Sequence, residues 1–311
     1  MTMETLRVSV IDPIEPAIGK AKDILFSPFD LGRWFIIGFC AWLANLGQGG
    51  FNFNFPFDKY QHHENLPARI HDFVMNNLAQ VIIAGSIAVV IGIAVLLVLL
   101  WLSSRGKFMF LHCIAQNKAE VKNPWHSCRP QGNSLFLFQL VVGIASFLCV
   151  IFCVAAVATV VIAMKTYGIK MIVLVPLLVF IISIFILLII VFAIVFKFTV
   201  DFVVPIMYIR SCTCLEGWRQ FLQILSHNKG RFVLYILFQI VIAMAVGVIV
   251  FAGVCLTCCC ACCLMAIPYI GTVLLLPILI FQRAYSLIYL RQYGNQFDVF
   301  VPVANIIDTA V

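Results

Sequence analysis

Residues 135–196 contain two long apolar runs separated by a short polar turn, and this stretch restricts the possible folds more than any other. The runs, residues 135–164 and 171–196, contain no charged side chain, and Lys165 and Lys170 flank the turn between them. A helix rises about 1.5 Å per residue and the hydrocarbon core of a bilayer is about 30 Å thick, so each run can cross a membrane. The backbone must satisfy its own hydrogen bonds in hydrocarbon. The stretch therefore predicts two antiparallel transmembrane helices.

The composition of the whole chain agrees with a membrane protein. Apolar residues make up 63% of the chain and charged residues 11%, and the mean hydropathy is +1.09. In a soluble domain about a quarter of the residues are charged. The net charge of +7 is attributed to basic cytoplasmic loops, and no nucleic-acid partner is expected. Because no cleavable signal peptide is recognisable, the first span is expected to act as its own insertion signal.

Four further apolar runs lead to a prediction of six transmembrane helices arranged as three hairpins. The chain is expected to be an all-α polytopic membrane protein with a single transmembrane domain over residues 1–311. The predicted spans are 31–46, 79–102, 135–164, 171–196, 232–256 and 264–282, with an external loop at 47–78 and cytoplasmic loops at 103–134 and 197–231.

The distribution of basic residues predicts the orientation. If both termini and the loops 103–134 and 197–231 lie on one side, 16 of the 20 Lys and Arg residues are on that side. An excess of Lys and Arg marks the cytoplasmic side of a membrane protein. Both termini are therefore expected in the cytoplasm.

Two segments on the cytoplasmic side have the pattern of amphipathic helices at a membrane surface. The first begins near Asp12 and Pro13, and the second covers residues 209–227. The apolar stripe of the second is formed by Leu215, Trp218, Phe221, Leu222 and Leu225. Tryptophan anchors helices at membrane interfaces, and basic residues attract anionic head groups. The residues predicted to contact lipid are Trp125, Trp218, Arg219, Lys229 and Arg231. Two alternatives remain: the basic residues only determine topology, and the stripe packs against the protein or a partner.

The sequence can also be divided into three copies of one structural unit. Each third contains a surface helix, a basic residue before a span, an outward helix and a return helix; the basic residues are Arg33, Arg129 and Arg231. Internal repeats of this kind are common in transporters. The alternative is that any protein with six spans divides into three hairpins.

Two stretches of the chain resemble a known family. The first runs from Phe26 to Trp34, continues with Ala41-Trp-Leu-Ala44 and precedes a Gly/Phe/Asn-rich segment. The second is Trp101-Leu-Ser-Ser-Arg-Gly-Lys-Phe-Met-Phe110 with Asn123-Pro-Trp125 and Gly132-Asn-Ser-Leu-Phe136 beyond it. These motifs are similar to a bacterial and archaeal family of integral membrane proteins of unknown function, over about residues 12–145. Members commonly have a longer glycine run where this chain has Phe51–Phe57. The resemblance implies a multi-span protein of a prokaryotic cytoplasmic (inner) membrane, and it carries no catalytic residues.

Polar residues near the spans argue against an ion-coupled pump. Buried ionisable groups mark ion pathways in membranes, yet all acidic residues lie outside the apolar runs. The nearest is Asp201, for which a surface ion pair with Lys197 is expected. Gln80, Gln139 and Gln239 remain within the runs. A passive pore or a lipid-handling protein stays possible.

The cysteines near the last span are the most unusual local feature. Cys258, Cys259 and Cys262 have spacings that could bind copper or zinc. No neighbouring charge favours thiolates there, so we interpret these cysteines as small packing residues and expect no metal and no cofactor. The external loop contains His62, His63, Glu64, His71 and Asp72, whose spacing matches no standard metal site.

The sequence leaves three functional hypotheses. The first is a non-enzymatic membrane protein that organises or regulates the membrane or other proteins, with membrane lipids, including anionic ones, and other membrane proteins or a second copy as partners. The second is a passive channel or carrier for a small or lipid-like solute. The third is a membrane enzyme, whose groups would come from the cytoplasmic loops: His112, Glu120, His126, Glu216 and His227.

Overall fold

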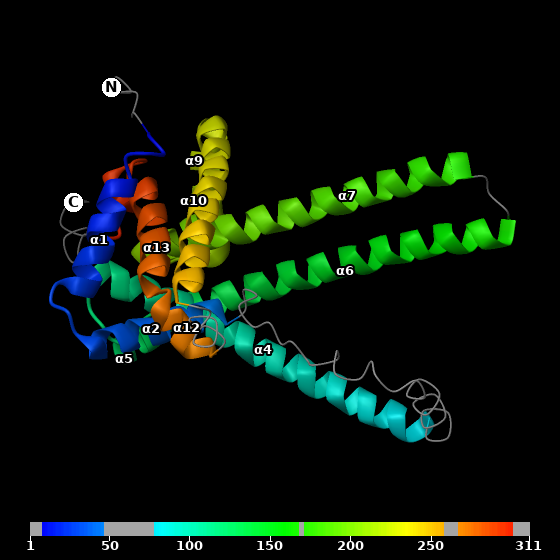
Figure 1. The fold of residues 1–311 in the computed structure, drawn as a ribbon, viewed down its shortest axis with the longest axis horizontal. Coiled ribbons are helices and arrows are strands. Elements are labelled where there is room, and N and C mark those ends of the chain that lie inside the picture. The colour runs from blue at the N-terminus through cyan, green and yellow to red at the C-terminus, as the bar shows by residue number, and fades with distance from the viewer. Residues whose placement is uncertain (1–7, 47–77, 168–170, 258–266, 301–311) are drawn as a thin grey trace.

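The structure is a computed structural model that describes residues 8–46, 78–167, 171–257 and 267–300 (Figure 1). Every regular element in these ranges is a helix, which confirms the all-α prediction. The elements are α1 (Ile14–Phe26), α2 (Leu31–Asn45), α4 (Leu78–Gln116), α5 (Lys122–Ser127), α6 (Arg129–Tyr167), α7 (Met171–Phe198), the π-helix η2 (Thr199–Val203), α8 (Val204–Arg210), α9 (Cys214–His227), α10 (Lys229–Leu256), α12 (Pro268–Leu274), α13 (Leu276–Arg291) and the 3-10 helix η3 (Asn295–Phe297).

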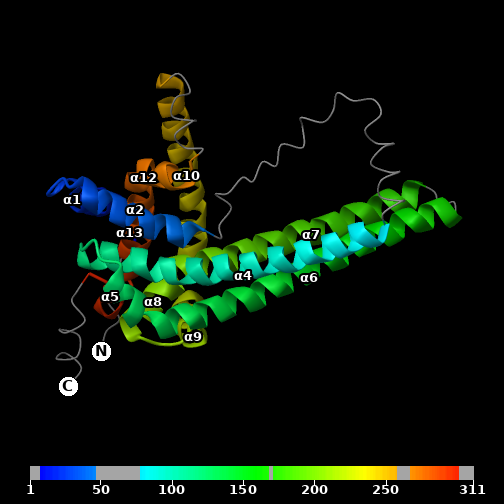
Figure 2. The same cartoon turned by 90° about the horizontal axis from the view of Figure 1, so that it is seen from below.

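Four helices in the described part of the chain are long and apolar enough to cross a membrane. They are Leu78–Gln116, Arg129–Ala163, Val175–Arg210 and Lys229–Leu256. Large apolar side chains along these helices are exposed, as lipid-facing side chains would be. Figures 1 and 2 show α4, α6 and α7 extending away from a compact bundle, and in Figure 2 α10 projects from this bundle in another direction. The four helices are compatible with a multi-pass membrane protein.

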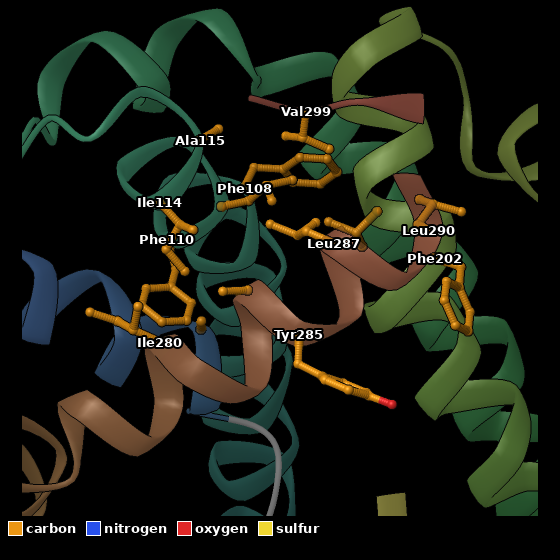
Figure 3. Close-up of a cluster of buried hydrophobic side chains, with 14 of the residues drawn as sticks. Phe108, Phe110, Ile114, Ala115, Phe202, Ile280, Tyr285, Leu287, Leu290 and Val299 are labelled. Carbon is orange, nitrogen blue, oxygen red and sulfur yellow. The ribbon is translucent and has the colours of Figure 1, made fainter. Parts of the chain in front are cut away.

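The compact bundle contains the buried core. Its fully buried large side chains come from helices far apart in the sequence, and include Phe108 of α4, Phe202 of η2 and Tyr285 of α13 (Figure 3). Aromatic rings pack edge to face or stacked within it; the centroids of Phe202 and Phe221, for example, are 5.2 Å apart. Such pairs contribute about 0.5–1.5 kcal/mol beyond the area that they bury. The core is therefore assembled from helix ends that lie beyond the exposed apolar runs.

Helix α2 and helix α4, which contain the first two predicted spans, pack antiparallel. The contact lies along the part of α4 that follows the predicted span 79–102. The hydroxyl of Ser103 donates to the carbonyl oxygen of Ala44 at 2.9 Å, and Arg33 donates to Asn117 at the other end. The reason is that α4 continues to Gln116 and offers a surface of small residues. A Cβ atom at Gly106 would lie 2.5 Å from the carbonyl carbon of Leu43.

The central hairpin is arranged as predicted, whereas the loops and the last span differ. Helices α6 and α7 lie side by side. The predicted cytoplasmic loops 103–134 and 197–231 are largely helical, because the flanking helices continue through them. The last span is interrupted between α12 and α13 at Leu275, and α13 continues to Arg291. Arg283 therefore lies inside the bundle, not at the end of a helix.

The predicted amphipathic helices are present with different boundaries. Helix α1 begins at Ile14 after Pro13, and the expected Asp12 cap makes no side-chain hydrogen bond to it. The second segment is divided at Ser211, which has a φ of 50° and ends α8; α9 begins at Cys214. The α1–α13 contact brings the two ends of the described chain together, and Ser9 exchanges two hydrogen bonds with Gln292.

The contacts between helices support the hypothesis of three repeated units. Each short helix contacts the return helix of the preceding unit: α5 contacts α4, α9 contacts η2 and α8, which continue α7, and α1 contacts α13. The outward helices follow the same order. Helix α6 contacts α4, α2 contacts α12 and α13, and Tyr235 of α10 bonds to Asp201 of η2. The three units are thus arranged cyclically, and α1 closes the ring.

Candidate functional site

The three return helices each place a basic residue at the same level of the bundle. Lys107 of α4 lies five residues beyond the apolar run 79–102, Lys197 directly follows 171–196, and Arg283 of α13 directly follows 264–282. Because each helix continues past its apolar run, Lys107 and Arg283 are buried within the bundle, while Lys197 is partly exposed. Together with Asp201 they form what we call the charged centre.

Asp201 is held by groups from two helices. Its Oδ2 atom pairs with Nζ of Lys197 at 2.9 Å and accepts a hydrogen bond from the hydroxyl of Tyr235, also at 2.9 Å. Gln239 in turn donates to the Tyr235 oxygen at 2.9 Å. The expected ion pair is present, but it is not a surface pair: the Asp201 side chain is only 8% exposed and that of Lys197 is 45% exposed. Asp201 lies outside the apolar run, as the sequence indicates, but the expectation of a surface pair is wrong for its buried carboxylate.

Arg283 is buried on the opposite side of the same centre. The residue is 7% exposed, and its Nη1 atom donates to the carbonyl oxygen of Val200 in η2. Its Nη2 atom is buried and has no hydrogen-bond partner among the described residues. π-Helical turns inside longer helices are rare and frequent at functional sites. Here the π-helix supplies both Asp201 and the acceptor for Arg283.

A cavity of about 130 Å³ lies between these charged groups. It is lined by Ala44, Asn45, Lys107, Phe110, Lys197, Val200, Asp201, Leu279, Gln282 and Arg283. Three of these side chains are cationic and one is anionic. Lys107 is 6% exposed and pairs with no carboxylate among the described residues. A buried charge costs several kcal/mol unless it is paired, so the cavity has the electrostatics of an anion-binding site.

A second basic residue of α4, Arg105, lies beside the centre in an aromatic box. Its guanidinium carbon is 4.2 Å from the ring centroid of Trp101 and 4.9 Å from that of Trp125. Its Nη2 atom donates to Asn133 at 3.2 Å, and Gly132 leaves room for its side chain. Cation–π contacts of this kind contribute about 0.5–2 kcal/mol each. Arg105 thus has aromatic and hydrogen-bond partners within the protein, although its Nε atom is buried without a hydrogen-bond partner among the described residues.

One family model, described as a family of unknown function (DUF7544), matches residues 8–280. The chain belongs to DUF7544. This confirms the resemblance to a family of unknown function. No curated protein and no solved structure matches the chain. The matched range includes Lys107, Lys197 and Asp201, and Arg283 lies just beyond it.

The predicted lipid-contact residues of this DUF7544 protein lie in different surroundings. Trp125 is half-buried against Trp101, beside Arg105. Trp218 is half-buried against Phe138 and Phe221, while Arg219 and Lys229 are exposed. Arg231 lines a pocket of about 490 Å³ together with Arg210. Contact of these residues with lipid stays a prediction.

The apolar stripe of α9 faces two directions. Phe221 is fully buried, and its ring packs against Phe198 and Phe232, with centroids 5.3 Å away in both pairs. Leu215 is 73% exposed and Leu222 is 50% exposed. The expectation that the whole stripe faces the membrane is therefore wrong for Phe221, and only the side with Leu215 and Leu222 is free for lipid.

The other polar residues singled out in the sequence do not form one site. Gln80 is exposed on α4, Gln139 accepts from Ser104 at 3.0 Å, and Gln239 bonds to Tyr235. Each of three enzyme candidates has a local partner: His112 bonds to Tyr208, Glu120 accepts from Asn123, and His227 bonds to the carbonyl of Gln223. His126 and Glu216 are exposed.

The predicted cysteine and histidine clusters lie outside the described residues. Cys258, Cys259 and Cys262, and His62, His63, Glu64, His71 and Asp72, all lie outside the described residues. Within the described ranges no group of three His, Cys, Asp or Glu side chains could hold a metal ion. In the Cys-x-Cys pair before α9, burial raises the pKa of Cys214 to about 12, so this thiol stays protonated at neutral pH.

Sequence reasoning missed the charged centre, although a signal for it was present. Each basic residue is followed by aromatic residues at short spacing in an extended helical pattern: Phe108 and Phe110, Phe198 and Phe202, and Tyr285 and Tyr289. A solvated loop does not need such aromatic residues. We had assigned these segments to basic loops because charge alone marks the cytoplasmic side.

Proposed function

We propose that this protein is a non-enzymatic, multi-pass protein of a prokaryotic cytoplasmic membrane that binds an anionic ligand at its charged centre. The observation that carries this proposal is the excess of buried cations around one small cavity, with the Nη2 atom of Arg283 unpartnered. An anion in the cavity would complete the hydrogen bonds and balance the charge. Charge-assisted hydrogen bonds of this kind are about twice as strong as neutral ones.

The position of the centre supports a regulatory or organising role. Its groups come from α4, α7, η2 and α13, which belong to all three repeated units. An anion bound there would connect the units and stabilise their assembled arrangement. Binding to the folded form alone stabilises a protein by about 2.7 kcal/mol at a ligand concentration of 100 times Kd. The ligand would therefore determine how firmly the membrane helices are held together.

The membrane topology that we propose places the charged centre at the cytoplasmic boundary. Six spans with both termini inside remain the arrangement that best explains the basic residues. In this arrangement the exposed Leu215 and Leu222 of α9 would contact the inner leaflet. Burial of one such side chain is worth about 1.5–3 kcal/mol. The basic residues Arg219, Lys229 and Arg231 would add attraction to anionic head groups.

The alternatives have less support. A carrier or channel would be favoured by one continuous polar cavity lined by Gln80, Gln139 and Gln239, but the described structure separates these residues. An enzyme would be favoured by clustered His and Glu side chains, and those described are engaged in separate local contacts.

Thermal unfolding of the full-length protein in detergent tests the proposal. Added anionic phospholipid should raise the Tm by several degrees relative to zwitterionic phospholipid. Lys107→Gln should remove most of this difference, because Lys107 lines the cavity. Lys122→Gln is the matched control, since Lys122 is exposed on α5 and does not line the cavity. Equal Tm values with the zwitterionic lipid, with the anionic lipid and with added inorganic phosphate, or equal effects of the two substitutions, would contradict anion binding at the centre.

A further inference from the structure

We infer that the ligand of the charged centre is a terminal phosphate dianion. Its source is either the phosphate monoester of a lipid head group or free inorganic phosphate. This inference rests on the proposed function, namely that the centre binds an anion. It goes further by naming the charge and the size of the group that fits. Three observations support the inference: the charge balance of the cavity, the volume of the cavity, and the hydrogen-bond donors that line the cavity.

The charge balance favours a dianion. Lys107, Lys197 and Arg283 contribute three positive charges, and Asp201 contributes one negative charge, which leaves a net charge of +2 (3 − 1 = 2). A phosphate monoester carries about −1.5 to −2 at neutral pH. A phosphodiester or a carboxylate carries a single negative charge and would leave one buried cation unbalanced. An uncompensated buried charge is costly, so the centre should discriminate against monoanions.

Asp201 strengthens the expected preference for a dianion over a monoanion. Its Oδ2 atom is already occupied by Lys197 and Tyr235, so the carboxylate belongs to the folded centre and is not displaced by the ligand. The carboxylate compensates one of the three cations before any ligand binds. The remaining cations, Lys107 and Arg283, come from different helices and line the same cavity. A single dianion can neutralise both.

The volume of the cavity limits the ligand to a small group. A cavity of about 150 Å³ accepts a benzene molecule, and this one measures about 130 Å³. A phosphoryl group is of comparable size. A glycerol or sugar head group attached to the phosphate would need additional space. The cavity therefore has room for a terminal phosphate.

The available donors match phosphate oxygens. Arg283 lines the cavity, and its buried Nη2 atom has no hydrogen-bond partner among the described residues; guanidinium groups bind phosphate with well-defined geometry. Lys107 adds an ammonium group with three donors. Between these donors the wall is apolar, formed by Ala44, Phe110 and Leu279. The oxygens of the ligand would therefore meet donors on the charged side, while its apolar part could leave toward the membrane.

Native mass spectrometry of the delipidated, full-length protein tests the inference. The probes are dioleoylphosphatidic acid, a monoester; dioleoylphosphatidylglycerol, a diester; dioleoylphosphatidylcholine, which is zwitterionic; and inorganic phosphate. We expect the monoester lipid or inorganic phosphate to bind about tenfold more tightly than the diester. Preferential binding of inorganic phosphate would identify a soluble source, and preferential binding of the monoester lipid would identify a lipid.

Two outcomes would overturn the inference, and they are distinguishable. If monoester and diester lipids bind equally and both more tightly than the zwitterionic lipid, the dianion inference is wrong and the proposed anion-binding function stands. If no anion binds more tightly than the zwitterionic lipid, both are wrong.

Variants that change the charge of the centre provide an independent test. Because Arg283 is buried, its replacement risks unfolding the bundle, so the more exposed Lys197 is used. Lys197→Gln lowers the net charge to +1 (2 − 1 = 1) and should reduce the monoester preference from about tenfold to about twofold. Asp201→Asn raises the net charge and should tighten diester binding. The exposed Lys122→Gln should leave the preference unchanged. A preference that is the same in all three variants would overturn the inference.

Discussion

The hydroxyl of Tyr235 donates a hydrogen bond of 2.9 Å to Oδ2 of Asp201, the same oxygen that pairs with Lys197. Tyr235 lies on α10 and Asp201 on η2, so this bond connects the second and third repeated units. Tyr235 is itself fully buried and accepts a hydrogen bond from Gln239. A carboxylate in the core is tolerated only when its charge is paired and its oxygens are bonded. Tyr235 fulfils part of this requirement.

Replacing Tyr235 by Phe should destabilise the protein by about 1–3 kcal/mol, because a buried carboxylate oxygen loses a donor. Denaturant unfolding in detergent measures the change. Tyr269→Phe is the control: the Tyr269 hydroxyl donates to the Phe35 carbonyl, an oxygen that the backbone of α2 also pairs within the helix. Its effect should be within about 0.5 kcal/mol. Similar losses in both variants would contradict the role assigned to Tyr235.

The close contact between α2 and α4 depends on Gly106. A Cβ atom at this position would lie 2.5 Å from the carbonyl carbon of Leu43 and 2.6 Å from the nitrogen of Ala44. Gly106→Ala should therefore force the helices apart and cost about 1–3 kcal/mol or more. Gly143→Ala on α6 has no atom within 4 Å of the added Cβ. It should be neutral or stabilising by up to about 1 kcal/mol. Thermal unfolding compares the two, and a neutral Gly106→Ala would refute the packing of α2.

The two faces of α9 should respond differently to truncation. Phe221→Ala removes a fully buried ring and should cost about 3–5 kcal/mol. Leu215→Ala removes an exposed side chain and should change the unfolding free energy by less than about 0.5 kcal/mol. Unfolding in detergent measures both changes. If Leu215→Ala were the more damaging substitution, α9 would pack with the opposite face inward.

The orientation is tested by labelling single cysteines in intact cells with a membrane-impermeant reagent. In a cysteine-depleted background, Lys118→Cys and Arg219→Cys should remain unlabelled, because both positions lie on the side that carries most basic residues. Tyr60→Cys should be labelled, since the sequence places residues 47–78 outside. Labelling of Lys118→Cys from outside would overturn the orientation, and permeabilised cells provide the positive control.

The sequence predicted the helical class, the long apolar helices and the central hairpin, because length and hydropathy decide these features locally. It did not predict that α4 continues past Leu102, or that α2 pairs with this continuation. That pairing depends on a few small residues, Ser103 and Gly106 among them, whose partners lie about sixty positions earlier in the chain. Periodicity carries no information on such partners.

The charged centre was missed for a related reason. Lys107 and Arg283 were counted as topology signals, since a basic residue after an apolar run marks the cytoplasmic side equally well when it is solvated. Only the three-dimensional arrangement shows that these residues share one cavity with Asp201. The ion pair of Lys197 and Asp201 was predictable from its i, i+4 spacing, but its burial was not.

The contact between α1 and α13 has a consequence for biosynthesis. The hydroxyl of Tyr285 donates to the carbonyl oxygen of Val10 at 2.8 Å, and Ser9 and Gln292 exchange two hydrogen bonds. Helix α1 therefore acquires its partner α13 only after the helices between them have been made. Until then the apolar residues Ile24 and Leu25, which the finished protein buries, have no partner helix. Contacts between such distant segments form late in folding. We expect nascent chains truncated before α13 to be the preferred substrates of membrane quality-control proteases.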